Sequence, residues 1–247
     1  MTVIDSPDTP GGAPERALVV TAHPDDVDFG SAGTVAHWTA AGASVTYCVC
    51  TSGEAGAPED SPRERVRRLR ASEQRRAAAR VGVDDVRFLN HEDGRVSADL
   101  ALRRQVTRVI RSVRPEIVVT HSPEINWSRI ALAHPDHRAV GEATLAAVYP
   151  DARNPFAHPE LLDREGLHPW TVRQLWITEA TAERVNHAVD ITERVEDKLA
   201  ALSEHASQGA DSAELSEAMR EHLRGNALRY GLAEGRMAEV FQVVDTE

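Results

Sequence analysis

The chain of 247 residues contains only two cysteines, Cys48 and Cys50, and they stand two positions apart. In a strand this spacing places both thiols on the same face, so they cannot join distant segments through a disulfide. A fold held together by disulfides is therefore excluded. A reducing, cytoplasmic location is the expected one.

Long apolar runs are also missing from the sequence. No stretch of 18 or more apolar residues occurs, so we expect no membrane-spanning helix. The first residues, MTVIDSPDTPGGAPE, are acidic and rich in proline and glycine. A secretory signal has the opposite character, with basic residues followed by an apolar segment. We therefore expect no signal peptide and predict that residues 1–16 form a disordered lead-in.

Positive charge is scarce, because 28 Lys and Arg stand against 39 Asp and Glu and give a formal net charge of −11. Such a surface repels polyanions, so we expect neither nucleic acid nor an anionic membrane as a partner. The arginine-rich run 63–80 also contains Glu64 and Glu73 and is typical of a solvated helix face. A small-molecule substrate is the expected partner.

Hydrophobic residues make up 41% of the chain, which is enough for a sizeable core. Short apolar runs alternate with helical patterns along most of the sequence. The expected strands are 17–22, 44–51, 86–89, 116–121, 172–178 and 239–244. The expected helices are 31–41, 62–80, 99–113, 132–148, 192–206 and 213–229. This alternation predicts right-handed βαβ crossovers, and hence an α/β, Rossmann-like three-layer fold with a mostly parallel sheet.

We predict that residues 17–247 form one α/β domain with a C-terminal helical elaboration. The helix pair within 192–229 has two interpretations, which the sequence leaves open. It packs on its own sheet, or it forms the interface of a homo-oligomer.

Polar residues that directly follow strands are the candidates for a functional site, because ligands bind beyond the carboxyl ends of parallel strands. Residues 23–28, His-Pro-Asp-Asp-Val-Asp, follow the first expected strand. Three carboxylates this close together repel one another, and a bound cation would relieve the repulsion. The proline and the helix start after it direct neighbouring side chains apart. Asp25 and Asp26 are therefore expected to have separate roles.

A second cluster consists of His121 at the end of the fourth expected strand and, after a loop, the run His134-Pro135-Asp136-His137. A helix that begins at Pro135 places His134 and His137 on nearly the same side. A His and an Asp from the first cluster with a His from the second leave a fourth position free, which is typical of catalytic zinc. Iron, cobalt or nickel fits the same ligands.

Each cluster taken alone is equally well explained as a helix cap, and only their combination favours a metal. Four histidines remain ambiguous at this level: His91, His121, His158 and His168.

At these two clusters the sequence resembles the PIG-L/LmbE-like family of zinc-dependent N-acetylglucosaminyl deacetylases. The family signature is His-Pro-Asp-Asp-x-Glu after the first strand and His-Pro-Asp-His downstream. The likeness covers residues 17–148 and includes a Thr-x-Gly-Glu turn at 51–54 and the pair Arg70 and Glu73. One departure is Asp28, which stands where the family has Glu.

The resemblance implies a metal-dependent hydrolase that removes an acetyl or other acyl group from an amide nitrogen, using water activated by Zn²⁺. It implies that the substrate is an N-acetylglucosamine-containing small molecule, or another N-acyl amino sugar or conjugate. It implies His23, Asp26 and His137 as metal ligands. It implies Asp25 as general base and a protonated His134 as the cation that steadies the oxyanion. Asp28 and Asp136 would orient the metal ligands without binding the metal themselves, whereas Arg70 and Asp93 would contact the substrate.

Two alternatives stay open. The first is a zinc amidase that acts on a non-sugar conjugate or natural product. Residues 149–171 contain Phe156 and Trp170 among prolines, and we expect this segment to shape the pocket. Such a pocket would admit an aromatic group as easily as a sugar. The second is a non-catalytic Rossmann-like binding module. The first turn has no Gly-x-Gly-x-x-Gly, and its acids would repel a pyrophosphate, so nucleotide binding is disfavoured.

Overall fold

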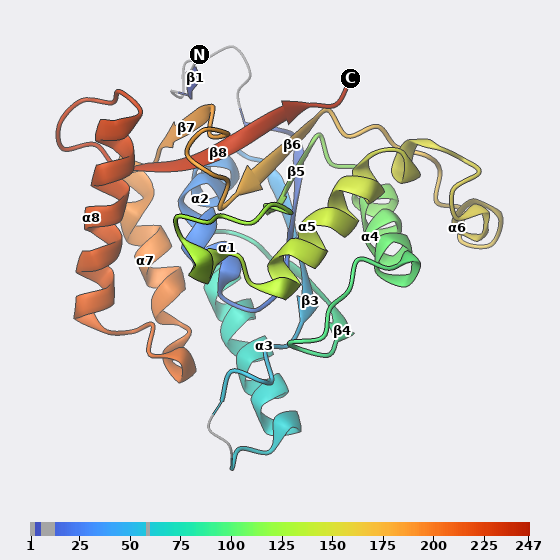
Figure 1. The fold of residues 1–247 in the computed structure, drawn as a ribbon, viewed down its shortest axis with the longest axis horizontal. Helices are drawn as coiled ribbons and strands as arrows, with labels where there is room; N and C mark the ends of the chain where they lie inside the picture. Colours follow the sequence, from blue (N-terminus) through green and yellow to red (C-terminus); the bar gives the residue numbers. More distant parts are fainter. Residues whose placement is uncertain (1–2, 6–12, 58–59) are drawn as a thin grey trace.

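The computed structural model describes residues 3–5, 13–57 and 60–247. Within them, eight strands form one sheet in the order β1-β7-β8-β6-β5-β2-β3-β4 (Figure 1). Their bounds are β1 Val3–Asp5, β2 Arg16–Thr21, β3 Ser44–Thr51, β4 Asp85–His91, β5 Ile117–His121, β6 Gln174–Thr178, β7 His187–Asp190 and β8 Ala238–Asp245. Only β8 runs antiparallel to its neighbours, β6 and β7. The predicted α/β fold with a mostly parallel sheet is confirmed.

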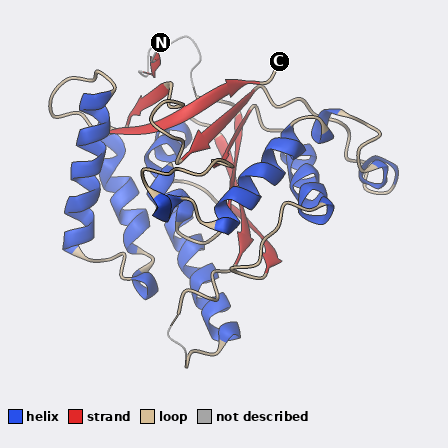
Figure 2. Cartoon of the chain, in the orientation of Figure 1, coloured by secondary structure: helices blue, strands red, loops and turns tan. Residues whose placement is uncertain are grey.

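Helices cover both faces of the sheet and give the three expected layers (Figure 2). They are α1 Asp26–Gly30, α2 Ala32–Ala40, α3 Arg63–Arg80, α4 Leu100–Val113, α5 Pro135–Val148, α6 Pro159–Asp163, α7 Val195–Ser203 and α8 Ala213–Arg229. Helices α2, α3, α7 and α8 contribute to the apolar core on one face, and α4 and α5 to the core on the other. No helix in the described ranges is long and apolar enough to cross a bilayer.

Strand β2 lies in the middle of the sheet, and its composition follows from burial on both sides. Ala17 and Val19 pack into one core, whereas Leu18 and Val20 pack into the other. Because successive side chains of a strand point to opposite faces, a strand covered on both faces is apolar throughout. Cys48 and Cys50 of β3 likewise lie together on the α4 and α5 side as buried free thiols.

The structure differs from the predicted disordered lead-in at residues 3–5. These form β1, which pairs in parallel with β7. The physical reason is that the outer edge of β7 offers unpaired backbone groups to any chain that lies beside it. Residues 1–2 and 6–12 fall outside the described part of the chain, so the prediction is not tested there. Strand β7 itself, only four residues long, was not expected.

The expectation that residues 149–171 shape the pocket is wrong. Helix α5 carries the chain from the carboxyl edge of the sheet to the opposite edge, and the segment packs there. Trp170 Nε1 donates to the carbonyl of Pro115, just before β5, at 2.7 Å. Arg111 of α4 donates to several carbonyls within the segment. Helix α6 accordingly lies beside α4, and Phe156 is exposed to solvent (Figure 1).

Candidate functional site

The candidate site lies at the carboxyl ends of three neighbouring strands, β2, β5 and β6. Residues 23–26 connect β2 to α1, His121 is the last residue of β5, and Glu179 directly follows β6. Residues 134–137 cap and begin α5. Because β6, β5 and β2 are adjacent in the sheet, their carboxyl ends bring these four segments together.

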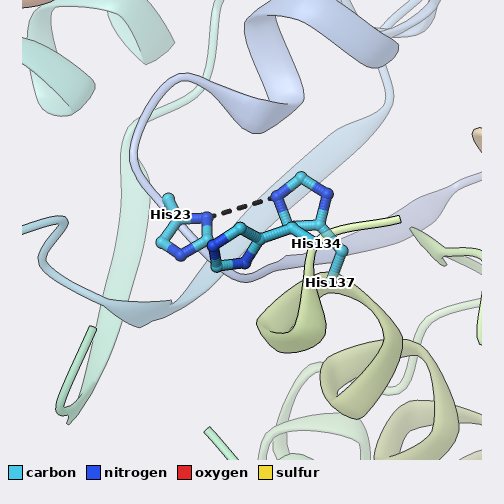
Figure 3. Close-up of side chains that lie close together, drawn as sticks. All are labelled: His23, His134 and His137. Carbon is cyan, nitrogen blue, oxygen red and sulfur yellow. Dashed lines mark hydrogen bonds between the residues drawn. The ribbon is translucent and has the colours of Figure 1, made fainter. Parts of the chain in front are cut away.

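The three predicted metal ligands lie close together. His23 Nδ1 is 3.2 Å from His137 Nε2 and 3.4 Å from Asp26 Oδ2. His137 Nε2 is 3.2 Å from Asp26 Oδ1. Ligand atoms about 2.05 Å from a tetrahedral zinc ion stand about 3.3 Å from one another. The three side chains therefore lie as close together as ligands of one zinc ion do, with Asp26 reaching the two histidines through different oxygens. Figure 3 shows His23 and His137 together with His134.

Three trios of side chains in this region bring one ligand atom each within 4.8 Å of the others. These trios are His23, His134 and His137; Asp26, His121 and His137; and His23, Asp93 and Asp136. All of them share members with the predicted ligand set. The region is thus one continuous cluster of imidazoles and carboxylates.

The electrostatics of the cluster favour positive charge. Burial opposes protonation of His23, but hydrogen bonds with three carboxylates, led by Asp136, outweigh it and raise the pKa of His23 to about 12. Burial also opposes protonation of His137, whereas the charge of Asp26 leads the groups that raise its pKa to about 10. The carboxylates that stabilise these protonated rings would also stabilise a divalent cation, because a metal that binds displaces the protons from its ligands.

The two adjacent acids point to different neighbours, as expected. Asp26 faces the histidines, whereas Asp25 Oδ2 lies 3.1 Å from Arg70 Nη2. Asp25 has a φ of +87°, a strained conformation for a residue with a Cβ, and its N–H donates to Gln74 Oε1 at 2.8 Å. Burial and then the charge of Asp26 raise the pKa of Asp25 to about 7, with Arg70 opposing them.

Two carboxylates hold His23 from the far side of its ring. Asp136 Oδ2 is 3.3 Å and Asp93 Oδ1 is 3.0 Å from His23 Nε2. Asp136 also accepts the N–H groups of Gly94 and Val96, at 2.7 and 3.2 Å. Asp136 is therefore placed to orient His23, as predicted. Asp93 makes the same kind of contact and so differs from the substrate contact that the resemblance implies.

Arg70 is buried beneath the site, with 4% of its surface exposed. Its guanidinium donates to the carbonyls of Gly53 and Pro24, each at 2.8 Å, besides contacting Asp25. Gly53 has a φ of +66°, and a Cβ there would lie 2.3 Å from Arg70 Nη1. Only glycine fits that close approach. Arg70 thus ties two loops to Asp25, where the resemblance implied a contact with substrate.

Asp28 is fully buried and makes no hydrogen bond to the three ligands. Its Oδ2 lies 2.9 Å from Gln74 Nε2 and 2.8 Å from His205 Nε2, and its carbonyl accepts from Lys198 at 2.8 Å. Gln74 in turn accepts the N–H of Asp25. Asp28 therefore supports the loop of Asp25 through Gln74, one step further from the ligands than predicted.

His134 is the exposed member of the cluster. Its Nδ1 accepts the N–H of Asp136 at 3.2 Å and caps α5. A ring nitrogen that accepts a hydrogen bond carries no proton, so the ring is neutral and its hydrogen is on Nε2. Burial, and then the charge of His23, lower the pKa of His134 and favour the same state. This neutral state differs from the protonated His134 that the resemblance implies.

Two residues of the cluster were missed by the sequence analysis. His121, which was left ambiguous, has its Nδ1 3.1 Å from Glu179 Oε2. The same oxygen lies 3.1 Å from His137 Nδ1. The signal that could have found them is their position, because His121 ends β5, which pairs with β2, and Glu179 follows β6, which pairs with β5. The argument that singled out residues 23–28 applies equally to β5 and β6.

Comparison with known proteins gives matches along most of the chain. The family model described as GlcNAc-PI de-N-acetylase, PIG-L, matches residues 18–148. Diacetylchitobiose deacetylase of Thermococcus kodakarensis is 31% identical over 233 residues, which cover 93% of this chain and 83% of the relative. A 1D-myo-inositol 2-acetamido-2-deoxy-alpha-D-glucopyranoside deacetylase of Catenulispora acidiphila is 28% identical, with 80% and 81% covered.

A solved structure resembles the chain just as extensively. N,N'-diacetylchitobiose deacetylase from Pyrococcus horikoshii superposes with a TM-score of 0.83 at 26% identity. The match covers 94% of this chain and 84% of that one. The similarity therefore extends beyond residue 148 into the C-terminal strands and helices.

Proposed function

The chain belongs to the PIG-L family of de-N-acetylases, and from this membership we propose that it removes the acetyl group from an N-acetylglucosamine-containing small molecule with the help of a bound metal. The observation that carries the proposal is the close approach of His23, Asp26 and His137, whose ring nitrogens and carboxylate oxygens lie 3.2 to 3.4 Å apart. The relatives named above act on acetamido sugars, which is the basis for the substrate class.

We assign His23, Asp26 and His137 as ligands of Zn²⁺, with Fe²⁺ as another ion that suits the same donors. When bound, the ion would lower the pKa of a water molecule toward 7 and polarise the acyl carbonyl. Asp136 and Asp93 keep the His23 ring turned so that Nδ1 faces the other two ligands. This support fixes ligand geometry before any substrate arrives.

Asp25 is the proposed general base. It takes a proton from the attacking water and later gives a proton to the departing amine, so that acetate and a free amine are the products. Its backbone strain and its contact with Arg70 hold the carboxylate in one place. His134 is the proposed donor to the acyl oxygen, because Nε2 carries the hydrogen of its neutral ring and the side chain is exposed to an incoming substrate.

A panel of amides tests the proposal. The zinc-loaded protein is incubated with N-acetylglucosamine, diacetylchitobiose, a glucosaminide of inositol and non-sugar amides with fatty or aromatic acyl groups. We expect release of acetate from the acetamido sugars, its loss with a chelator and its return with zinc. Hydrolysis of the non-sugar amides alone would favour a general amidase. Absence of both bound metal and turnover would refute the enzyme.

Replacing Arg70 with lysine is expected to lower kcat by about 10- to 100-fold, the usual effect of losing a group that orients a catalytic residue, and to leave KM nearly unchanged. The reason is that Arg70 is buried against Asp25 and two carbonyls and does not face the substrate. Steady-state kinetics of the variant measure kcat and KM separately. Arg76→Lys, at an exposed position of the same helix, is the control. A rise in KM at constant kcat would instead show that Arg70 binds substrate.

A further inference from the structure

We propose that Glu179 is a positioning residue that holds two of the metal ligands, His137 directly and Asp26 through His121. This inference rests on the metal site proposed above and adds a fourth segment of the chain to it. No feature of the sequence resemblance pointed to Glu179, which lies beyond the region that the family model matches.

A single carboxylate oxygen connects two imidazoles. Glu179 Oε2 is 3.1 Å from His121 Nδ1 and 3.1 Å from His137 Nδ1. The two rings stack with centroids 4.0 Å apart and an angle of 16° between their planes. Stacking presents both Nδ1 atoms to the same side, where the carboxylate accepts from both.

The protons in this arrangement can be assigned. An ionised carboxylate only accepts hydrogen bonds, so the hydrogen of each ring is on Nδ1. When a bound metal displaces the second proton of the ring, the lone pair becomes free on His137 Nε2, the atom that faces His23 and Asp26. A metal ligand needs this lone pair, and the partner of the other ring nitrogen selects which nitrogen offers it. Glu179 therefore fixes the tautomer in which His137 can bind a cation.

His121 extends the same effect to the second ligand. Its Nε2 lies 3.1 Å from the backbone nitrogen of Ala22 and 3.2 Å from Asp26 Oδ2. The ring therefore limits how far that carboxylate can turn. His121 is fully enclosed in the protein and does not reach the substrate. The contacts form a closed ring of His137, Glu179, His121 and Asp26.

The backbone around Glu179 is arranged to present this carboxylate. Glu179 has a φ of +60°, which costs free energy in a residue with a Cβ and persists where the surroundings enforce it. Thr178 fixes the preceding position, because its hydroxyl donates to Thr120 at 3.2 Å and its carbonyl accepts the N–H of Ser122 at 3.1 Å. The side chain of Glu179 is only 19% exposed, so water competes little for its oxygen.

The test is the zinc affinity of the full chain with Glu179 replaced. Chelator competition with Zn²⁺ alone measures the dissociation constant of wild type, Glu179→Ala and Glu179→Gln. We expect binding about 10- to 100-fold weaker in the alanine variant, because outer partners of ligands have effects of this size. The glutamine variant keeps an acceptor oxygen without its charge and is expected to fall between the two. Glu124→Gln, at an exposed carboxylate 3.0 Å from Arg184, is the matched control and should bind zinc normally.

A spectroscopic readout separates positioning from a merely structural role. Nitrogen-15 spectra of the histidine rings in the zinc-loaded protein should show His137 with its hydrogen on Nδ1 in the wild type and a mixture of Nδ1- and Nε2-protonated rings in Glu179→Ala. Thermal unfolding followed by circular dichroism checks that each variant is folded. If the alanine variant does not fold, the isosteric Glu179→Gln decides the question.

The possible failures are distinguishable. If His137→Ala retains zinc with wild-type affinity, the proposed metal site itself is wrong. If His137→Ala loses zinc but both Glu179 variants bind it within twofold of wild type and keep the wild-type tautomer, the inference about Glu179 alone is overturned.

Discussion

Replacing Asp25 with asparagine is expected to lower kcat by about 10² to 10⁴ while the protein still binds zinc, because a general base contributes about this much. Asparagine has nearly the same shape and can still accept from Arg70, but it cannot take a proton from water. The side chain that faces His23, His121 and His137 is Asp26, so the change leaves the three proposed ligands intact. Turnover and zinc content of the purified variant measure the two effects.

The control for this experiment is Asp99→Asn. Asp99 caps α4 by accepting the N–H of Leu102 at 2.9 Å, and asparagine caps a helix equally well. Its activity should equal that of the wild type. Loss of zinc from Asp25→Asn would instead mean that Asp25 is a ligand, and our division of the acidic pair would be wrong.

Removing the imidazole of His137 is expected to abolish both zinc binding and turnover. His137→Ala leaves only His23 and Asp26 of the three proposed ligands. His121 stacks on His137, and its Nε2 is already engaged by the backbone nitrogen of Ala22 and by Asp26 Oδ2. The buried Asp26 carboxylate also loses one of the three imidazoles that surround it. Metal analysis of the dialysed variant gives the stoichiometry directly.

A second histidine serves as the reference for that measurement. His168 is exposed on the segment that packs at the opposite edge of the sheet. His168→Ala should retain one zinc per chain and full turnover. Equal zinc content in the two alanine variants would remove His137 from the ligand set.

Much of the fold and part of the site could be predicted from sequence, because the signals are local. Residues 23–28 and 134–137 each lie within one short segment, and apolar runs followed by helical patterns indicate a parallel sheet. The strand order places the two segments together. That His23, Asp26 and His137 meet within 3.4 Å follows from this topology.

The remaining features depend on contacts that no local pattern contains. Glu179 is a single acid after a short strand, and only the register of β6 against β5 brings it to His121. Asp93 and Arg70 were assigned to substrate by analogy, whereas burial turns both toward other residues of the protein. The composition of residues 149–171 suggested a pocket, but α5 carries the chain away from the carboxyl edge of the sheet before this segment begins.

The buried ion pair between Lys198 and Glu239, at 2.8 Å, has an evolutionary consequence. Glu239 also accepts the N–H groups of Gly33 and Thr34, and Lys198 donates to the carbonyl of Asp28. Recombination between relatives with a crossover between residues 198 and 239 would separate the two charges and leave one of them unpaired in the interior. Viable chimeras should therefore inherit Lys198 and Glu239 from one parent, and substitutions at the two positions should change together over time.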